Sequence, residues 1–431
     1  MGIPAQTDIL VIGGGPAGSC AATQLARLGY AVVLIDKVRH PRETVGESIL
    51  PSAWKYFDLL GVTERVEREG FVKKAGGVVD WENEVTQISF RDFDYDRPGL
   101  HVERGALDHL LLDNARNAGV QVLENVRAES FAAHGEHDAE VRLLDGETKE
   151  NRTVRCRFLV DASGQSSFIA QQLGARRLDS DFRFVALWGY FTDSRYVSTG
   201  GMVRPFEEIP QHPPMTFVSS LGNWGWAWHI PLRKDTSVGI VVPVEDYKQN
   251  GAEKSREQYF LDTCRSTGNL GRLLEGAHLP DGGVRLMRDY SYAPEKIAGP
   301  GYFVIGASGF VDPIFSVGVI MALYSGQLAA WAIDSSLRRP AQTPAYRTLF
   351  ETQMRGRYQL SRTMALPTHD ETSEAPRAAK LYFDFISKSE KELMWSAASM
   401  TTRSGNLLRT SGESRVPPPL KRRSLQELRF E

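Results

Sequence analysis

The sequence predicts an α/β fold in which a Rossmann-like dinucleotide-binding domain is interleaved with an antiparallel β-sheet domain and followed by a helical C-terminal region. The chain opens with the strand, helix and strand patterns typical of the first domain, at 8–13, 17–28 and 31–36. Between 182 and 242 the pattern changes to alternating aromatic and β-branched residues. A buried-strand pattern returns at 302–306, and a long helical pattern follows at 319–337.

This order of patterns sets the expected domain boundaries. The dinucleotide-binding domain is expected in two pieces, 1–180 and 284–340, because its last strand and helix come from distant sequence. The antiparallel sheet of the second domain is expected at 181–283. The segment 341–400 has a mostly helical pattern. The basic, proline-containing segment 401–431 is expected to be a flexible tail.

Composition narrows the class of protein. The 431 residues are 42% hydrophobic, enough for a large core in two to three domains. A net charge of -2 gives no overall field that would attract nucleic acid or an anionic membrane. Three widely spaced cysteines without a Cys-x-x-Cys pair indicate a reducing compartment and no metal site. Since no apolar run suits a signal peptide or a membrane span, we expect a cytoplasmic protein.

The first strand-to-helix turn, at 13–18, contains Gly-x-Gly-x-x-Gly. Glycines permit a tight turn and a close approach of the backbone to pyrophosphate, while the helix start offers free N–H groups. An aspartate at the end of the second strand can accept a ribose hydroxyl. The alternative is a glycine-rich turn without a ligand. The expected nucleotide-binding residues, which suit FAD or NAD, are Gly13, Gly14, Gly15, Ala17, Gly18 and Asp36.

Two distant segments carry chemistry of their own. Trp226 and Trp228 stand two residues apart in a strand-like segment, so their side chains share one face. They form either an aromatic wall or an ordinary core pair. The segment 310–318 leads into the helix predicted at 319–337, and the free N–H groups at such a helix start can bind an anion. Ser316 is also a good helix cap, and capping and anion binding are compatible.

Several motifs resemble those of known flavoproteins. Arg-Glu-Thr-Val-Gly-Glu-Ser at 42–48, Val-Glu-Arg at 102–104 and Asp-Ala-Ser-Gly at 161–164 are similar to the accessory flavin motifs of single-component FAD hydroxylases. Trp-x-Trp-x-Ile-Pro at 226–231 and Phe-x-x-Pro-x-x-Ser-x-Gly at 310–318 resemble the paired signatures of flavin-dependent halogenases. On these motifs the chain resembles a flavin-dependent halogenase of the phenol or pyrrole type.

The resemblance implies an FAD-binding domain beside a substrate domain, with FAD used as FADH2. It extends the cofactor site to Arg42, Glu47, Arg104, Asp312 and Val319. The residues that it implies for holding chloride or bromide, the co-substrate, are Ser316, Val317 and Gly318. The barrier that it implies between flavin and substrate, which would disfavour direct hydroxylation, consists of Trp226, Trp228 and Phe315.

The same resemblance selects one lysine as catalytic. Gly-Phe-Val-Lys-Lys-Ala-Gly at 70–76 is similar to the family's Phe-x-x-Lys-x-Gly, and alignment on Phe71 and Gly76 selects Lys74 over Lys73. A desolvated amine can accept Cl⁺ as a chloramine, whereas an ammonium group can hydrogen-bond to hypohalous acid. The sequence leaves both roles open. Without the flanking motifs, a solvent-exposed lysine is the default interpretation.

The expected substrate is an electron-rich ring. Tryptophan halogenases carry a glutamate just before the motif serine, where this chain has Phe315. A phenol or pyrrole is therefore favoured over tryptophan, either free or on an acyl or peptidyl carrier protein, in secondary metabolism. Because no second glycine-rich fingerprint is present for a nicotinamide, FADH2 is expected from a separate flavin reductase. The basic residues at 421–423 are either a contact for an acidic carrier or part of a solvated tail.

One departure from the family and two rival functions complete the expectations. Ala307 follows Gly306 where the family usually has an aspartate, which predicts weak binding of oxidised FAD. An FAD-dependent aromatic hydroxylase or prenyl-reductase-like flavoprotein would share the glycine fingerprint and Arg104. A non-catalytic flavin-binding protein would agree with Ala307. Neither rival explains Lys74 together with the paired tryptophans.

Overall fold

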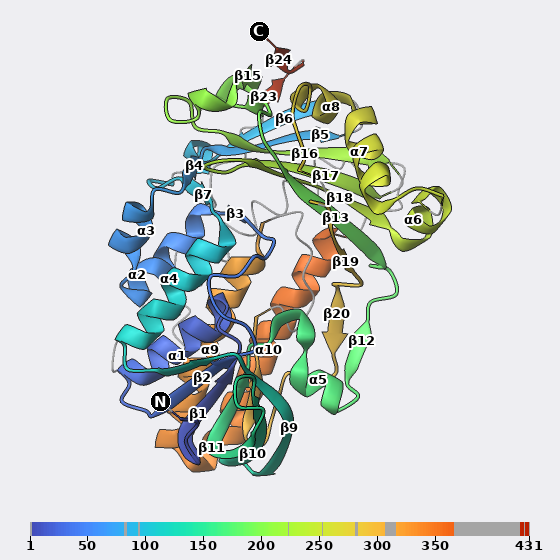
Figure 1. Cartoon of the computed structure of the whole chain (residues 1–431). Helices are drawn as coiled ribbons and strands as arrows, with labels where there is room; N and C mark the ends of the chain where they lie inside the picture. The colour runs from blue at the N-terminus through green and yellow to red at the C-terminus, as the bar shows by residue number, and fades with distance from the viewer. Residues whose placement is uncertain are drawn as a thin grey trace.

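The computed structural model describes residues 2–81, 84–93, 95–222, 224–251, 253–280, 283–306, 316–365, 423–425 and 427–430. Two large sheets frame the molecule, and the second lies across the dinucleotide-binding part of the chain (Figure 1). Helices flank both sheets. This arrangement confirms the predicted α/β fold class with its interleaved second sheet and C-terminal helical region.

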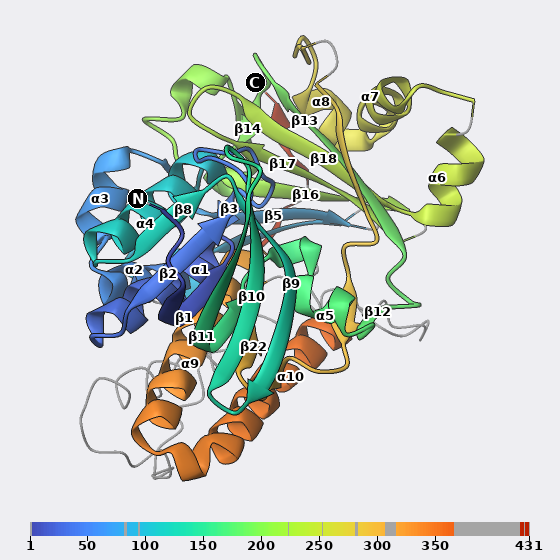
Figure 2. The same ribbon diagram turned by 60° about the horizontal axis from the view of Figure 1, so that its bottom comes forward.

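The first sheet contains the predicted dinucleotide-binding strands. Its order is β21 (Ala298–Gly299), β22 (Tyr302–Val304), β11 (Asn151–Asp161), β1 (Gln6–Ile12), β2 (Val32–Asp36) and β8 (Gln121–Glu124). From β22 to β8 the strands run parallel. The apolar runs of β22, β11, β1 and β2 are buried because such sheets are covered on both faces, whereas the edge strand β8 is half-buried. An antiparallel hairpin extends the sheet and projects from it (Figure 2); it consists of β9 (Val126–Gly135) and β10 (Asp138–Asp145).

Four helices belong to this part of the fold: α1 (Pro16–Arg27), α4 (Arg104–Asn117), α9 (Gly318–Arg338) and α10 (Thr343–Ala365). α1 packs against both α4 and α9. The approach of α9 is close, since a Cβ at Gly326 would lie 2.5 Å from the Ala17 carbonyl oxygen. α10 packs along α9 (Figure 2). Distant sequence thus completes the dinucleotide-binding part, as predicted, while residues 366–400 of the predicted helical region lie outside the described residues.

The second sheet is assembled from distant strands. Its order is β19 (Arg285–Arg288), β13 (Phe184–Phe191), β18 (Thr236–Pro243), β17 (Gly225–Pro231), β16 (Met215–Gly222), β5 (Gly76–Trp81), β6 (Glu84–Ser89) and β23 (Arg423–Leu425). All neighbouring pairs are antiparallel except β16 and β5. β19, β5, β6 and β23 come from outside 181–283. The parallel pairing of β5 with β16 requires a long connection between these two strands.

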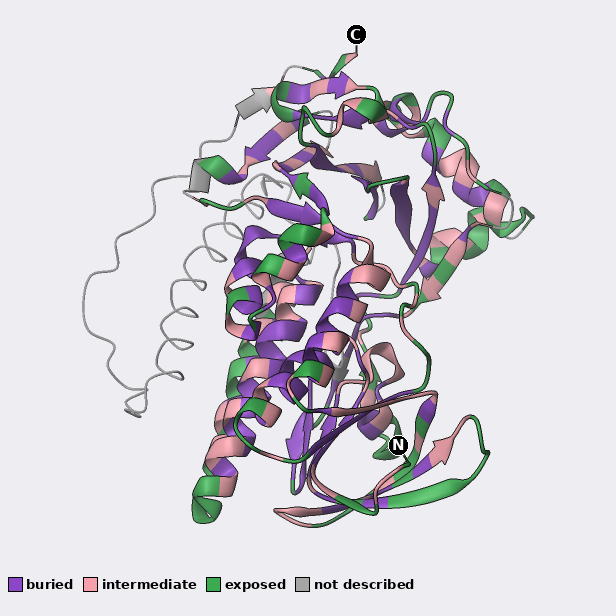
Figure 3. Cartoon of the chain, turned by 60° about the vertical axis from the view of Figure 1, so that its left-hand side comes forward, coloured by how far each residue is buried: buried purple, intermediate pink, exposed green. Residues whose placement is uncertain are grey.

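The two faces of the second sheet meet different surroundings. Along β17, Trp226, Trp228 and Ile230 join the core shared with the first sheet, whereas Ala227 points to the opposite core. That outer core is covered by α6 (Val244–Gly251), α7 (Arg256–Ser266) and α8 (Gly268–Leu273). Figure 3 shows the strands of both sheets as mostly buried and the outer loops and projecting hairpin as more exposed.

Short elements complete the described chain. One small sheet joins β3 (Ser48–Ile49), β7 (Gly99–His101) and β4 (Val72–Lys74). Another pairs β12 (Arg176–Leu178) with β20 (Tyr292–Pro294), and a third contains β14 (Tyr196–Val197), β15 (Met202–Arg204) and β24 (Arg429–Phe430). The short helices are α2 (Trp54–Leu60), α3 (Thr63–Glu69) and α5 (Phe168–Gln172). Of the helices in the described ranges, none is long and apolar enough to cross a membrane.

The prediction of a flexible tail is wrong for residues 423–425 and 429–430. β23 pairs with β6, and β24 pairs with β15. An edge strand offers unpaired backbone N–H and C=O groups, so even a few polar residues can add to it. The guanidinium carbon of Arg272 also lies 3.6 Å from the ring centre of Phe430. The other residues of 401–431, except 427 and 428, lie outside the described residues.

Candidate active site

A cavity of about 1070 Å³ runs from the end of β2 to the inner face of the second sheet. Ligands of parallel sheets bind beyond the carboxyl ends of the strands, and β1 and β2 both end here. At its dinucleotide end the lining includes Gly13, Gly15, Ala17, Asp36, Arg42, Glu47 and Arg104. At its other end the lining includes Ser48, Thr216, Trp226, Trp228, Ser316, Gly318 and Val319. Most of the predicted site residues therefore share one cavity.

The glycine turn is packed closely against the protein's own backbone. Gly13 has a φ of +104°, and a Cβ there would lie 2.3 Å from the Ala162 carbonyl oxygen. A Cβ at Gly18 would lie 1.9 Å from the Gly13 carbonyl oxygen. Only glycine fits these two positions without a backbone shift. α1 begins just after Gly15 without a side-chain cap, which leaves its first N–H groups available to a phosphate.

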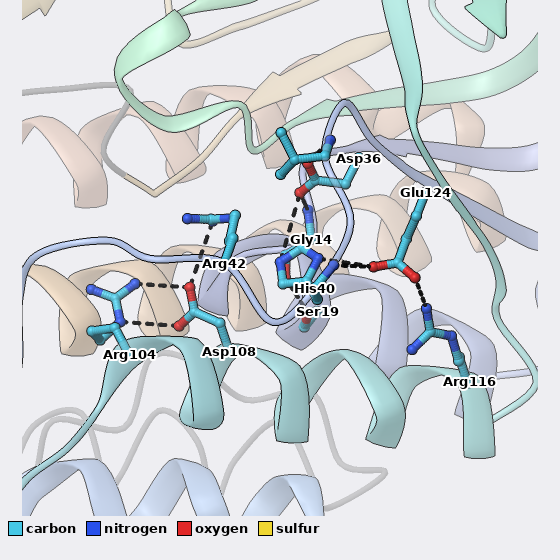
Figure 4. A network of polar contacts seen from close by, with 10 residues as sticks. Gly14, Ser19, Asp36, His40, Arg42, Arg104, Asp108, Arg116 and Glu124 are labelled. Atoms are coloured by element: carbon cyan, nitrogen blue, oxygen red, sulfur yellow. Dashed lines mark hydrogen bonds and ion pairs between the residues drawn. The ribbon is translucent and has the colours of Figure 1, made fainter. Parts of the chain in front are cut away.

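Asp36 is fixed by the backbone around it (Figure 4). The Gly14 N–H donates to Asp36 Oδ2 at 2.7 Å, and the Val38 N–H donates to Asp36 Oδ1 at 3.0 Å. His40 lies beneath the same turn, where its backbone N–H donates to Glu124 at 2.6 Å. Gly14 thus belongs to this network, while Asp36 remains on the cavity wall. Each carboxylate oxygen has further acceptor capacity, so Asp36 suits a ribose hydroxyl.

Arg104 holds the loop that borders the cavity. Its guanidinium donates to both oxygens of the buried Asp108 carboxylate, at 3.0 and 3.1 Å, and to the Val45 carbonyl at 2.8 Å. Arg42 approaches Asp108 from the other side at 3.6 Å (Figure 4). A two-pronged arginine–carboxylate pair is geometrically rigid. The pair therefore keeps the loop in place beside the cavity.

Glu47 is almost fully buried, at 1% exposure. The Gly46 N–H and the Tyr190 hydroxyl each donate to its carboxylate at 2.8 Å. Burial raises the pKa of Glu47, although both hydrogen bonds act in the opposite direction. With the glycine cradle, Asp36 and the size of the cavity, these residues fit FAD.

Trp226 and Trp228 share one face of β17 and line the cavity, in agreement with the predicted common face. Their ring centres lie 5.7 Å apart, with the planes inclined by 45°. The Trp228 indole N–H donates to Ser237 Oγ at 3.1 Å. Gly239 makes room for this ring, because a Cβ there would lie 2.1 Å from it. Phe315, the third predicted member of the barrier, lies outside the described residues.

The start of α9 borders the same end of the cavity. Ser316, Gly318 and Val319 are described there, whereas Asp312 and Ala307 lie outside the described residues. The helix begins at Gly318 and has no side-chain cap. The alternative interpretation of Ser316 as the cap does not hold, because its hydroxyl donates instead to Ser48 Oγ at 2.9 Å. The first amides of α9 remain available to an anion.

Lys74 is buried, at 3% exposure, whereas its neighbour Lys73 points outward. Alternation along β4 gives the two lysines opposite environments. The Lys74 ammonium or amine nitrogen donates to Ser48 Oγ at 2.7 Å and lies 5.3 Å from the ring centre of Phe90. Burial lowers the pKa of Lys74 to about 7. The amine is therefore substantially neutral near neutral pH.

A layer of hydroxyl groups separates Lys74 from the cavity. Ser48, Thr216 and Ser316 line the cavity, and Lys74 itself does not. Ser48 Oγ lies within 3.1 Å of Thr216 Oγ1 and also bonds both Lys74 and Ser316. A small molecule formed in the cavity meets these hydroxyls before it meets the lysine.

Comparison with known proteins shows the family to which this chain, with its dinucleotide-binding turn, tryptophan pair and buried lysine, belongs. The model of the FAD binding domain family matches residues 6–267. A tryptophan 2-halogenase of Chondromyces crocatus is 39% identical over 339 residues, which are 78% of this chain and 62% of that relative. The flavin-dependent halogenase armH3 of Armillaria mellea is 34% identical over 78% of this chain and 69% of its own length. The chain belongs to the flavin-dependent halogenase family.

Two other members of the halogenase family extend the comparison. A 1H-pyrrole-2-carbonyl-[peptidyl-carrier protein] chlorinase of Pseudomonas fluorescens is 29% identical over 81% of this chain and 80% of its own length. The structure of the myxobacterial chondrochloren halogenase CndH superposes with a TM-score of 0.76 at 29% identity, covering 89% of this chain and 90% of CndH. This chain spans less than two thirds of the length of the Chondromyces halogenase. The activity and substrate of this chain are therefore treated as proposals.

The family motifs did not reveal every polar residue near Lys74. Thr216 and His101 lie next to Ser48 and are nearly inaccessible to solvent, at 6% and 0% exposure. The only feature of the sequence that could have drawn attention to His101 is its position three residues before the predicted Arg104. Thr216 stands in an ordinary strand pattern. Within the described ranges, no group of three or more His, Cys, Asp or Glu side chains could hold a metal ion.

Proposed function

We propose that this chain uses FADH2, oxygen and chloride or bromide to form hypohalous acid, and that Lys74 directs the halogen to an electron-rich arene. The observation that carries the proposal is the place of Lys74. Its buried amine lies behind a hydroxyl layer at one end of a cavity whose other end has a dinucleotide-binding turn. Membership of the halogenase family supports the same reaction class.

The residues of the dinucleotide end would hold FAD. The free N–H groups at the start of α1 suit the pyrophosphate, and Asp36 suits the ribose. When bound and reduced, FAD would supply two of the four electrons that oxygen takes up, and the halide would supply the other two as it becomes hypohalous acid. We expect loose binding of oxidised FAD, since Ala307 replaces the carboxylate usual in the family.

The start of α9 is the proposed halide site. The aligned peptide dipoles of this long helix place a partial positive charge at its first turn, beside Val319 on the cavity wall. The candidate amides belong to Val317 and Gly318, with Ser316 next to them. Asp312, which the family resemblance assigns to the cofactor site, is proposed as a cofactor-binding residue.

The tryptophan pair is the proposed barrier between cofactor and arene. Trp226 and Trp228 are buried, packed against each other and held by Gly239 and Ser237, so they resist displacement. A ring substrate behind this wall cannot reach the flavin directly. Oxygen transfer to the arene is thereby disfavoured, and only a small oxidant such as hypohalous acid passes. Phe315 is proposed as a further member of the wall.

Lys74 is the proposed catalytic residue. In the substitution, a carbon–halogen bond forms, the oxygen–halogen bond of hypohalous acid breaks, and the ring proton leaves with hydroxide as water. A neutral amine can carry the halogen as a chloramine, and an ammonium group can donate a hydrogen bond to the departing hydroxide. Burial supports the first role, because a pKa of about 7 leaves the nitrogen lone pair available near neutral pH.

A phenol or pyrrole, free or carrier-bound, is the proposed substrate class. Phe315 in place of the glutamate of tryptophan halogenases supports a ring that its own heteroatom activates. The relative named as a pyrrolyl carrier-protein chlorinase supports a carrier-bound pyrrole. The relative named as a tryptophan 2-halogenase favours indole as the second candidate. A separate flavin reductase is the proposed source of FADH2.

The test uses the protein with FAD, a flavin reductase and either chloride or bromide. Phenols, pyrroles, tryptophan and carrier-loaded pyrrole are offered, and products are analysed by mass spectrometry. A halogenated product that requires the added halide supports the proposal. A hydroxylated product formed equally well without halide would instead identify an FAD-dependent hydroxylase. Absence of both products, with FAD bound and oxygen consumed no faster than by the reductase and FAD alone, would instead favour a non-catalytic flavin-binding protein.

A further inference from the structure

A chain of buried, hydrogen-bonded polar side chains begins at Lys74. The lysine nitrogen lies 2.7 Å from Ser48 Oγ, which in turn lies 3.1 Å from Thr216 Oγ1. Thr216 Oγ1 lies 2.8 Å from His101 Nε2. The other ring nitrogen, His101 Nδ1, lies 3.0 Å from the Pro231 carbonyl oxygen. The four side chains are at most 7% exposed, and they come from the separate strands β4, β3, β16 and β7.

The Pro231 carbonyl fixes the direction of this chain. A carbonyl oxygen only accepts hydrogen bonds, so His101 Nδ1 must carry a proton. Burial and the neighbouring Lys74 hold the pKa of His101 well below its ordinary value, so the ring stays neutral and Nε2 is an acceptor. Thr216 must therefore donate to His101, which leaves its oxygen to accept from Ser48.

Since the Ser48 hydroxyl proton is donated to Thr216, Ser48 Oγ can only accept hydrogen bonds from its other neighbours. Ser316 donates to Ser48 Oγ at 2.9 Å, and Lys74 must donate as well. With the opposite tautomer, in which Nε2 is protonated, Thr216 would donate to Ser48. Ser48 would then be free to donate to the Lys74 nitrogen. Because a neutral amine has one lone pair, that reversed bond would occupy it.

Resting on the proposed halogenase function, we propose that His101 is a positioning residue for Lys74. Its Nδ1-protonated tautomer, held by the Pro231 carbonyl, directs the hydrogen bonds through Thr216 and Ser48 so that Lys74 donates to Ser48 and keeps its lone pair for the halogen. Pro231 is the last residue of the Trp-x-Trp-x-Ile-Pro motif. The strand that forms the aromatic wall therefore also determines the direction of the hydrogen bond between Lys74 and Ser48.

The tautomer can be measured without turnover. In protein labelled with ¹⁵N-histidine, long-range ¹H–¹⁵N correlation spectra distinguish a protonated from a bare ring nitrogen. The His101 signals are assigned by their loss in His101→Leu and, independently, by their shift in Thr216→Val. We expect a proton on Nδ1 and a bare Nε2. A proton on Nε2 instead, or on both nitrogens, would overturn the inference.

The chain also offers a matched control for activity. His229 is as fully buried as His101 and lies on the strand of Pro231, but outside the hydrogen-bonded chain. We expect His101→Leu to lower the halogenated arene formed per FADH2 oxidised about tenfold or more, and His229→Leu to change this ratio less than about twofold. Equal losses in both variants would show a structural role only and contradict the inference.

A second pair keeps the test decisive if His101→Leu does not fold. Thr216→Val removes the hydroxyl at nearly constant shape, whereas Thr216→Ser retains it. We expect the product ratio to fall about tenfold in Thr216→Val and to be largely rescued in Thr216→Ser, because the step depends on one oriented O–H. Equal ratios in the two variants would contradict the positioning role.

Failure of the proposed function gives a different pattern. If the unmodified protein halogenates none of the arenes, the halogenase proposal fails, and the inference about Lys74 activation fails with it. If the unmodified protein halogenates and Lys74→Ala does not, but His101→Leu and Thr216→Val match the unmodified protein, only the positioning role fails.

Discussion

The two ends of the cavity are built in different ways. The dinucleotide end is formed mainly by backbone groups of one short turn: Gly13 and Gly18 permit the tight turn, and α1 supplies free N–H groups. At the lysine end, the polar side chains come from several separate strands. The first end depends on local conformation, and the second depends on how the sheets are assembled. Changes at the two ends should therefore fail in different ways.

The largest expected effect is on stability at the lysine end. Burial lowers the pKa of Lys74 from 10.5 to about 7, so between these pH values the unfolded chain binds a proton that the folded chain does not. Folding is thus disfavoured, by up to about 5 kcal/mol at pH 7, and the penalty disappears above pH 10.5. We expect Lys74→Met to raise the free energy of unfolding most at pH 7 and progressively less toward pH 10.5.

Urea unfolding of Lys74→Met across this pH range measures the effect. The exposed Lys73 is the control, and Lys73→Met should leave the free energy of unfolding nearly unchanged. A stability gain for Lys74→Met that is the same at pH 7 and at pH 10.5 would mean that packing, rather than buried charge, is responsible.

The next effect concerns the dinucleotide end. Gly18→Ala places a Cβ 1.9 Å from the Gly13 carbonyl oxygen, so the turn must shift. We expect the affinity for FAD to fall about a hundredfold, because the turn positions every backbone donor at once. Titration of FAD fluorescence measures this. Gly356→Ala, where a Cβ meets nothing within 4 Å, should keep the unmodified affinity; a comparable loss there would point to general destabilisation.

A smaller effect is expected from Asp36→Asn. The substitution keeps the shape but removes a charged acceptor for the ribose and for the Gly14 N–H at 2.7 Å. We expect FAD affinity to fall about tenfold, since a hydrogen bond to a charged group contributes roughly 1.5–3 kcal/mol. The amount of halogenated arene formed per FADH2 oxidised, measured at saturating FADH2, should stay the same. A changed ratio would mean that the two ends of the cavity are coupled.

The smallest effect is a pH dependence of product partition. Since the pKa of Lys74 is about 7, protonation removes its lone pair as the pH falls through that value. We expect the yield of halogenated arene per hypohalous acid formed to be about half its alkaline limit at pH 7, and to keep falling below it. The buried His101 stays neutral throughout, because its pKa is held well below its ordinary value. A flat profile from pH 6 to 9 would contradict a neutral, reacting amine.

The same contrast explains what the sequence could predict. The glycine turn, Asp36 and the common face of the tryptophans follow from residues close together in the chain, and the structure has them as predicted. Family motifs selected Lys74 over Lys73, and the structure places only Lys74 inside the molecule. These features need no knowledge of how distant strands pair.

Other features depend on long-range pairing and were missed or wrong. Ser316 was considered as a cap for α9, but the approach of Ser48 gives its hydroxyl a different acceptor. His101 and Thr216 carry no motif, because their role arises only when β7 and β16 meet beside β4. The added strands at 423–425 and 429–430 likewise depend on open sheet edges and on the outer core that Leu425, Leu428 and Phe430 join.

The most direct test of the central claim is the fate of hypohalous acid in Lys74→Ala, with Lys73→Ala as control. Both variants receive FADH2, oxygen, halide and an arene that the unmodified protein halogenates, together with a chemical trap for free hypohalous acid. Lys74→Ala should form almost no halogenated arene while trapped hypohalous acid rises, and Lys73→Ala should match the unmodified protein. Unchanged arene halogenation by Lys74→Ala would contradict the assignment of Lys74 as the residue that directs the halogen.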